Sequence, residues 1–326
     1  MDCFTDIADQ FWAQTRNGLT LGSIYAMIAL GYTMVYGVLQ LINFAHSEVF
    51  MVSTFATLYS LRNWYGVEQM PEGFGIVVLM IGAIIPAMLA SGLTALAVER
   101  FAYRPLRRRG APRLSFLISA IGASLFIQYL FVLMDGSHYL GPIPLPGIAG
   151  PNPQTVPSII ERSQVFSIFG TSFSNKHLIV IIAAGVMLFI LDRFVNQTKL
   201  GRGIRAVAQD AEAASIMGVN IDRVVVVTFL VGGLMAGAAG FFYSAILPGA
   251  PAFWFVGFLP GIKAFTAAVL GGIGNIRGAM LGGLLLGLVE AYSVPCFGSQ
   301  WTNVTAFVVL VLVLLFRPTG ILGEAT

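Results

Sequence analysis

Long apolar runs recur along the chain and constrain its fold more than any other sequence feature. Each is long enough for a helix to cross about 30 Å of hydrocarbon. Of the 326 residues, 57% are hydrophobic and 10% are charged, whereas about 25% are charged in soluble domains. The sequence therefore predicts an all-α polytopic membrane protein with a single transmembrane domain over residues 1–326.

The apolar runs define membrane segments at 18–39, 44–60, 74–99, 114–134, 177–195, 224–247, 258–273, 278–294 and 301–316. The seventh segment is short and is followed by the glycine-rich turn GGIGNIRG. Irregular backbone survives at membrane depth only where protein or water surrounds it. A re-entrant or broken helix near 258–278 would give eight crossing segments, and a complete helix would give nine. The N-terminal residues predict a short interfacial helix with Phe4, Phe11 and Trp12 as anchors.

Positive residues lie mostly on one side of these segments. Six arginines fall in 100–113 and five Lys or Arg in 193–223, and two further arginines bring that side to thirteen, against four on the other. Because basic loops stay in the cytoplasm, the N-terminus is expected outside and the C-terminus inside. This assignment makes 135–176 an extracytoplasmic loop and 196–223 a cytoplasmic loop.

The external loop combines a proline-rich part with an alternating part. Its six prolines favour extended and turn conformations over helix. The stretch QVFSIFGTSFS, with Gly170 and Thr171 near its centre, predicts a small hairpin. Such a loop suits either the docking of an external partner or the capping of helix ends, and the sequence favours neither.

Glycine pairs inside the segments predict dense helix packing. The spacing G-x-x-x-G, which lets membrane helices approach closely, occurs at Gly18/Gly22, Gly233/Gly237, Gly278/Gly282 and Gly283/Gly287. We interpret these pairs as mainly structural.

Ionisable residues inside membrane segments cost about 2.5–3.5 kcal/mol at the bilayer centre, so each needs an explanation. His46 and Glu48 are expected at the cytoplasmic interface, where the cost is small. One interpretation is that they belong to a gate or to the substrate path. The other is that they begin a helix that Asn43 caps, and the sequence favours this second interpretation. Glu99 beside Arg100 predicts a cytoplasmic anchor pair.

Lys263 and Glu290 are a second ionisable pair, expected in the outer half of two antiparallel helices. They can neutralise each other, line a vestibule that contacts a zwitterionic solute, or let Lys263 extend to the interface. Mutual pairing is the interpretation we favour. Further polar candidates for a substrate path are Tyr36, Gln128 and Asn275.

Several motifs are absent from the sequence. It contains no G-x-x-x-x-G-K-[ST] phosphate loop, no H-E-x-x-H and no G-x-S-x-G. No metal-ligand spacing occurs among the histidines His46, His138 and His177 or between the cysteines Cys3 and Cys296. The two cysteines would form a disulfide only in an oxidising compartment. We therefore expect no catalytic residues, no metal and no cofactor in this chain, and nothing predicts nucleic-acid binding.

A short polar segment at 201–220, GRGIRAVAQDAEAASIMGVN, interrupts the apolar sequence. Val207, Ala214 and Met217 recur at helical spacing, and Gly218 is a helix stop. An amphipathic helix between two spanning helices is either a lever that another protein grips or a solvated connector. The residues alone leave both interpretations open.

Three blocks, at 17–52, 201–224 and 258–292, together with FRPTGILGE at 316–324, strongly resemble branched-chain amino acid ABC importer permeases. The resemblance is to the shorter of that system's two permease types, and it covers nearly the whole chain. Urea and short-amide importers share this permease family. An ATP-independent secondary transporter is the alternative outside the family, although such proteins usually carry an intramembrane carboxylate network.

The resemblance implies a bacterial inner-membrane permease that pairs with a second permease. It also implies two ATPase subunits that bind the ATP, a periplasmic substrate-binding protein and a surrounding lipid membrane. The segment with E-A-A-x-x-x-G would be the coupling helix seated in an ATPase groove. Its contact residues would be Arg202, Arg205, Ala208, Asp210, Glu212, Ala213, Ala214, Met217 and Gly218.

The sequence departs from the family pattern in two places. Ser47 stands where N-F-A-H-G-E has glycine, which puts a close backbone approach there in doubt. The I-x-L-P that follows the broader ABC permease signature is absent after Gly218, which leaves the docking register open.

Overall fold

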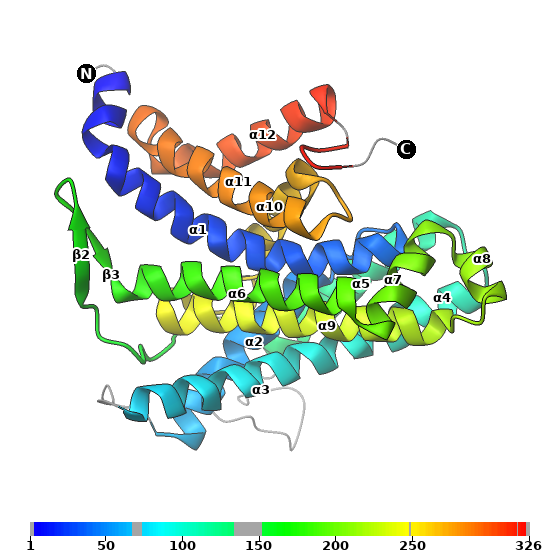
Figure 1. Cartoon of the computed structure of the whole chain (residues 1–326). Coiled ribbons are helices and arrows are strands. Elements are labelled where there is room, and N and C mark those ends of the chain that lie inside the picture. The colour runs from blue at the N-terminus through cyan, green and yellow to red at the C-terminus, as the bar shows by residue number, and fades with distance from the viewer. Residues whose placement is uncertain (1–2, 67–73, 134–151, 248, 318, 324–326) are drawn as a thin grey trace. The chain divides into compact units, whose positions relative to one another are not determined.

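The structure is a computed structural model that describes residues 3–66, 74–133, 152–247, 249–317 and 319–323. Seven of its helices are long and apolar enough to cross a membrane, which confirms the predicted all-α polytopic fold (Figure 1). The helices are α1 Cys3–Leu39, α2 His46–Tyr59, α3 Phe74–Val98, α4 Arg104–Arg108, α5 Arg113–Leu133, α6 Asn175–Gln197, α7 Lys199–Gln209, α8 Ala211–Ile216, α9 Ile221–Phe241, α10 Phe258–Gly271, α11 Ile276–Phe297 and α12 Thr302–Phe316.

Two of the nine predicted segments form short helices. Both α2 and α10 have 14 residues, a rise of about 21 Å that is less than the hydrocarbon thickness, but α2 continues into the π-helical turn Ser60–Trp64 whereas α10 ends at the glycine-rich turn. The prediction that the seventh segment is short is therefore correct. The predicted helix at the N-terminus is present, but it is the first part of α1, which is continuous from Cys3 because no helix breaker precedes Gly18. Its position at the membrane interface stays a prediction.

The chain divides into two compact units, described here separately. The first unit comprises residues 1–33, 162–201 and 262–326, and the second comprises 34–161 and 202–261. Helix α1 therefore contributes its first part to one unit and its last turns to the other.

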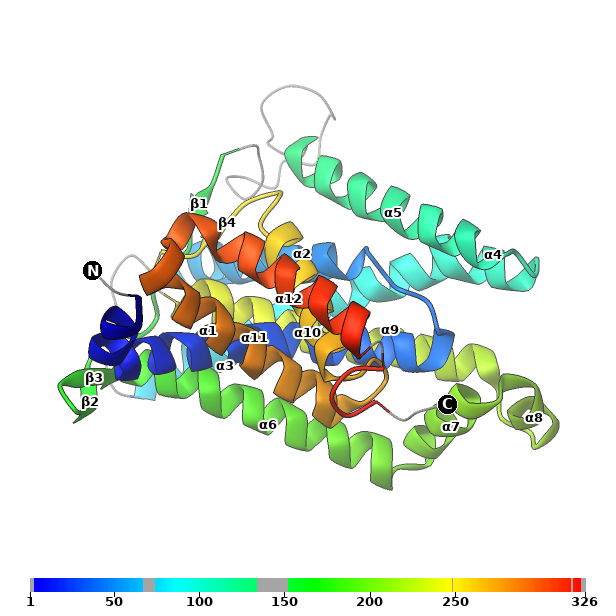
Figure 2. The same ribbon diagram turned by 90° about the horizontal axis from the view of Figure 1, so that it is seen from above.

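Glycine faces hold α1 against α11 in the first unit. A Cβ added to Gly22 would lie 2.8 Å from the Gly283 carbonyl oxygen, and one added to Gly18 would lie 2.8 Å from the Leu288 Cα. Any side chain there would separate the two backbones, so the predicted G-x-x-x-G packing is confirmed for this pair. Figures 1 and 2 both show α11 beside α1, with α10 and α12 next to it.

The glycine-rich turn after α10 is supported by the C-terminal residues. Backbone N–H groups of Ile321 and Leu322 donate to the carbonyls of Leu270 and Gly271 at 2.9 and 3.0 Å. Asn275 caps α11, because its Oδ1 accepts from the Gly278 N–H at 3.0 Å. The C-terminal residues therefore cover the start of this turn, where Gly271 and Gly272 are buried, while Gly274 is exposed.

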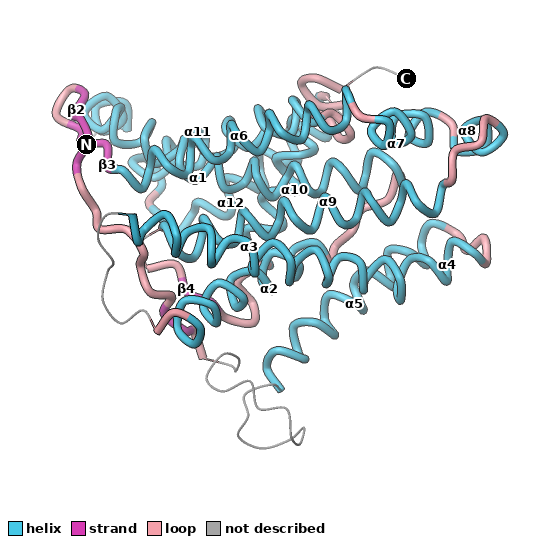
Figure 3. Tube along the Cα trace, turned by 60° about the horizontal axis from the view of Figure 1, so that its bottom comes forward, coloured by secondary structure: helices cyan, strands magenta, loops and turns pink. Residues whose placement is uncertain are grey.

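The second unit is built on α2, α3 and α9, which pack against one another (Figure 3). A Cβ on Gly233 of α9 would lie 2.6 Å from the Ala95 Cβ, and one on Gly237 would lie 2.5 Å from the Met88 Cα. Three helices in this unit, α2, α3 and α9, each run on into a π-helical turn, at Ser60–Trp64, Glu99–Tyr103 and Phe242–Ile246. Such turns occur often at functional positions.

The predicted hairpin is present in the described part of the external loop. Strands β2 (Gln164–Ile168) and β3 (Thr171–Ser174) pair antiparallel around Phe169 and Gly170. Two shorter strands, β1 (Gln154–Thr155) and β4 (Pro251–Ala252), pair in the second unit. Four of the six prolines, at positions 142, 144, 146 and 151, lie outside the described residues.

Cys296, near the end of α11, is disulfide-bonded. The sequence offered no support for this bond, since the two cysteines lie at opposite ends of the chain. The side chain of Cys3 lies outside the part of the structure that is described.

Candidate functional site

The polar segment 201–220 forms two short helices, α7 and α8. Asp210 caps α8, because its Oδ1 accepts from the backbone N–H groups of Glu212 and Ala213 at 2.9 and 3.0 Å. Gly218 ends the segment with φ +85° and donates its N–H to the Ser215 carbonyl at 3.0 Å. A capping carboxylate and a left-handed glycine therefore fix both ends of α8.

The residues predicted to contact another protein are mostly exposed. On α7, Arg202 and Arg205 are exposed while Ile204 and Val207 are buried. Of the remaining predicted contact residues, Ala208 is half-buried and Ala214 is buried, while the exposed members are Asp210, Glu212, Ala213, Met217 and Gly218.

Two apolar side chains at the end of this segment face outward. Ile216 is 82% exposed and Met217 is 83% exposed. They stand among polar and charged residues rather than within a membrane segment, so the bilayer does not explain their exposure. Large exposed apolar residues with a polar rim are typical of protein contact surfaces.

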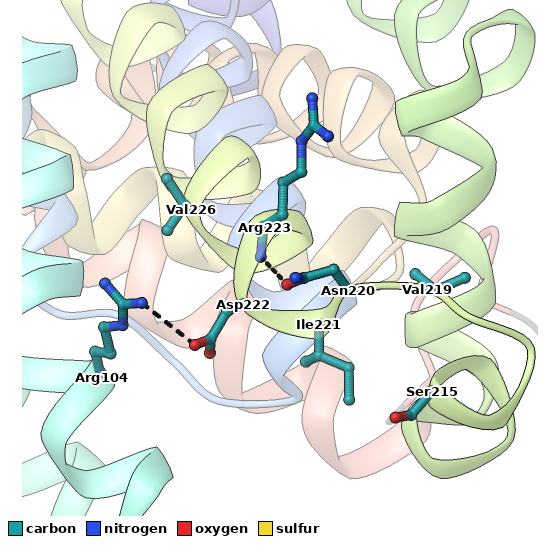
Figure 4. A pocket seen from close by; sticks show the side chains of 8 residues that line it. All are labelled: Arg104, Ser215, Val219, Asn220, Ile221, Asp222, Arg223 and Val226. Atoms are coloured by element: carbon teal, nitrogen blue, oxygen red, sulfur yellow. Dashed lines mark hydrogen bonds and ion pairs between the residues drawn. The ribbon is translucent and has the colours of Figure 1, made fainter.

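An open groove of about 600 Å³ lies beside α8. Figure 4 shows it between Ser215 of α8, the start of α9, and Arg104 of α4. Asn220 caps α9 at its edge, accepting from the Arg223 N–H at 2.9 Å. The groove is lined by Arg104, Ser215, Val219, Asn220, Ile221, Asp222, Arg223 and Val226.

Asp222, four residues after Gly218, joins this surface to the basic loop. Its Oδ1 accepts from Arg107 at 2.7 Å, and its Oδ2 lies 3.4 Å from Arg104 and 3.6 Å from Arg108. Arg107 also donates to Glu99 at 3.0 Å, and Glu99 is buried in the π-helical turn after α3. A charge network therefore connects the first turn of α9 with the end of α3.

Sequence reasoning missed this network. It paired Glu99 with Arg100, but the partner of Glu99 is Arg107, because the π-helical turn directs Glu99 inward while Arg100 is exposed. Arg107 and Asp222 are 115 residues apart in the chain. The only available signal was an isolated carboxylate next to the polar segment, together with an excess of arginines in 100–113.

Lys263 and Glu290 are brought together in the first unit. Lys263 Nζ donates to Glu290 Oε1 at 2.5 Å and to the Tyr25 hydroxyl at 3.3 Å. Lys263 is 9% exposed and Glu290 is 5% exposed. The two charges therefore neutralise each other inside the unit, and α10 and α11 are joined to α1 through Tyr25.

Glu48 and Gln128 are brought together in the second unit. Glu48 is fully buried, and its Oε1 accepts from Gln128 Nε2 at 2.7 Å and from Ser124 Oγ at 3.1 Å. His46 and Glu48 are at most 1% exposed and lie inside the protein, while their expected depth at the cytoplasmic interface stays a prediction. The loop before α2 is itself partly buried, at Asn43 and Ala45.

The other candidate path residues have separate roles. Asn43 Oδ1 lies 3.2 Å from the Tyr103 hydroxyl and accepts from the Ala45 N–H at 3.2 Å. These bonds support the start of α2, although Ala45, and not Asn43, is the residue that directly precedes the helix. Asn275 caps α11 and donates to the Leu322 carbonyl at 2.8 Å. Tyr36 is half-buried in the last turns of α1. The hydrogen bonds of Asn275 go to Gly278 and Leu322, which are not among the candidate path residues.

Long apolar helices, close glycine packing and ionisable groups held inside each unit are typical of a multi-pass membrane transport protein. Among the described residues, no group of three or more His, Cys, Asp or Glu side chains could hold a metal ion. Comparison with known families agrees with the class. The chain belongs to the family of permease components of branched-chain amino acid transport systems, whose model matches residues 14–315.

Characterised relatives match over nearly the full length. The chain is 41% identical over 316 residues to the high-affinity branched-chain amino acid transport system permease protein BraD of Pseudomonas aeruginosa, covering 95% of each chain. It is 40% identical over 315 residues to LivH of Escherichia coli strain K12, covering 96% of each. Similarity to the probable permease LivM of Methanocaldococcus jannaschii is weaker, at 23% over 258 residues, covering 75% of this chain and 69% of that one.

Proposed function

We propose that the chain is one permease subunit of an ATP-driven importer for branched-chain amino acids. The observation that carries this proposal is the match of about 40% identity over nearly the whole chain to permeases of that transport system. This match favours branched-chain amino acids over urea or short amides, and an ABC importer over a secondary transporter. The chain's own role is transport, and the missing phosphate loop agrees with ATP binding by other subunits.

A second, related permease would complete the translocation path. The chain resembles relatives named LivH and, more weakly, LivM, so two permease types of one family exist. Two ATPase subunits and an external substrate-binding protein would complete the importer. The exposed Ile216 and Met217 beside the open groove are suited to contact an ATPase.

The polar segment would face the cytoplasm. Thirteen positive residues lie on its side of the predicted segments and four on the other. The disulfide at Cys296 supports the same orientation, because disulfides persist mainly in oxidising compartments and the end of α11 would then lie on the side away from the cytoplasm. The N-terminus would then be outside and the C-terminus in the cytoplasm.

Alternating access would begin at α8 and spread through the charge network. When ATP-bound ATPases close, they would pull on α8 and on the first turn of α9. Asp222 would transmit this movement to Arg107, and Arg107 to Glu99 at the end of α3. Rigid helices joined by bidentate or shared charge contacts move together more readily than helices joined by a flexible loop.

Crosslinking tests the proposed ATPase contact. Met217→Cys introduces a thiol at an 83% exposed position, and Phe101→Cys introduces one at an 80% exposed position outside the segment. In the complex purified with its ATPase, we expect a short crosslinker to join the ATPase to Met217→Cys and not to Phe101→Cys. The same complex should show ATPase activity that rises with leucine-loaded binding protein. Equal crosslinking at both positions, or no stimulation, would contradict the proposal.

A further inference from the structure

Glu48 has an unusual environment for a carboxylate. It is 0% exposed, and its Oε1 accepts hydrogen bonds from Gln128 at 2.7 Å and Ser124 at 3.1 Å, with Ser47 Oγ at 3.0 Å. These three donors all lie against this one oxygen. The other oxygen, Oε2, is also buried and has no hydrogen-bond partner among the described residues.

No positive side chain in the described part of the chain forms an ion pair with Glu48, unlike the other two buried carboxylates. Glu99 is paired with Arg107, and Glu290 is paired with Lys263. A buried carboxylate without a cation is costly in a protein interior and more so at membrane depth. Among the described residues, Glu48 is therefore the buried carboxylate with no ion-pair partner, and its Oε2 is the atom to which a further donor could bind.

The protein around Glu48 is tightly packed beside Ser47 and less tightly packed along α5. Gly257 packs against the Ser47 carbonyl so closely that an added Cβ would overlap it. The close approach that Ser47 put in doubt is therefore made through Gly257. Two of the three donors, Gln128 and Ser124, lie on α5, which buries only Phe116, Ala120, Ile127 and Gln128. Separating α5 from α2 would expose Glu48 at a small cost in buried apolar surface.

We propose that Glu48 binds the α-ammonium group of the transported amino acid through Oε2 during its passage. This inference rests on the proposed function, since it requires a substrate with a primary ammonium group. Such a group supplies the missing positive charge and the hydrogen-bond donors that Oε2 lacks, whereas urea and simple amides carry no charge. Gln128 and Ser124 hold Oε1 and so aim Oε2 at the substrate.

The first test measures leucine uptake per ATP hydrolysed in the reconstituted complex. Glu48→Gln keeps the shape of the side chain and removes its charge, so uptake should fall about tenfold or more while stimulation of the ATPase by loaded binding protein persists. Glu48→Asp should recover part of the uptake. Ser119→Ala, on the same helix α5, removes a hydroxyl that donates to the Ala102 carbonyl at 3.0 Å and not to Glu48, so its uptake should stay within about twofold of the unmodified protein. Uptake by Glu48→Gln within about twofold would overturn the proposal.

A second measurement needs no variant and tests whether the substrate reaches Glu48 even if the Glu48→Gln complex fails to assemble. Dicyclohexylcarbodiimide modifies carboxyl groups in apolar surroundings, and mass spectrometry can locate the product in the unmodified complex. We expect leucine-loaded binding protein and ATP to protect Glu48 relative to unloaded binding protein and ATP, with Glu290 unchanged as the control in the same chain. Equal modification of Glu48 in both conditions would overturn the proposal. A complex that fails to transport leucine at all would instead contradict the proposed function.

Discussion

Replacing Lys263 with methionine is expected to lower the free energy of unfolding by about 3–5 kcal/mol. The substitution leaves Glu290 buried at 5% exposure without its cation, and its Oε2 already has no partner among the described residues. An unpaired charge in a membrane protein interior cannot be compensated by water. Denaturation of the purified protein by SDS in mixed micelles, followed by helix content, measures the loss.

The double variant Lys263→Met with Glu290→Leu should recover most of that stability. Replacing both members of a buried pair by apolar groups of similar volume is often neutral. The control is Arg277→Met, which breaks the pair between Arg277 and Asp192 at 3.0 Å, where the arginine side chain is 70% exposed. It should not change the unfolding measurably. A Lys263→Met variant as stable as the original would show that the pair has no structural role.

Gly218→Pro is expected to reduce leucine uptake to the background while the protein still reaches the membrane. Gly218 has φ +85° and donates its N–H to Ser215, whereas proline has φ near −65° and no N–H. The substitution therefore unfolds the end of α8, which presents Ile216 and Met217. Unfolding of a six-residue surface helix leaves the membrane segments intact.

Gly298→Pro is the matched control for this prediction. Gly298 also has positive φ, at +83°, donates its N–H to the Val294 carbonyl at 2.8 Å, and has no neighbour within 4 Å of an added Cβ, as is true of Gly218. It follows α11, outside the polar segment and the charge network of Asp222. We expect uptake by Gly298→Pro to remain close to normal. Equal loss in both variants would remove the special role of α8, and full uptake by Gly218→Pro would exclude the segment from coupling.

The sequence predicted the parts of the fold that depend on local chemistry. Apolar runs located the membrane helices because length and composition alone decide which segments suit lipid. Glycine spacing predicted close packing, and the structure shows which helix faces which: Gly22 meets Gly283. The short seventh segment and the external hairpin were also predicted. The N-terminal helix was also predicted, but not its continuity with the first segment, although nothing in the sequence before Gly18 stops a helix.

The candidate sites were predicted less completely. Lys263 and Glu290 lie on neighbouring segments, so their pairing could be inferred from antiparallel geometry. Asp222 and Arg107 could not be paired, because their contact depends on how α9 and α4 pack. The contacts of Glu48 with Gln128 and Ser124 could not be predicted either, because they depend on how α5 packs against α2. Long-range packing, rather than local pattern, decides both cases.

The central claim is that this chain transports its substrate only when a separate ATPase hydrolyses ATP. Leucine uptake into proteoliposomes, with leucine-loaded binding protein outside and ATP inside, tests it directly. The complex is compared with one whose ATPase binds ATP and cannot hydrolyse it. The account predicts that uptake falls to the level of protein-free liposomes in the second complex. Uptake that continues there, driven by an ion gradient or by leucine alone, would contradict it.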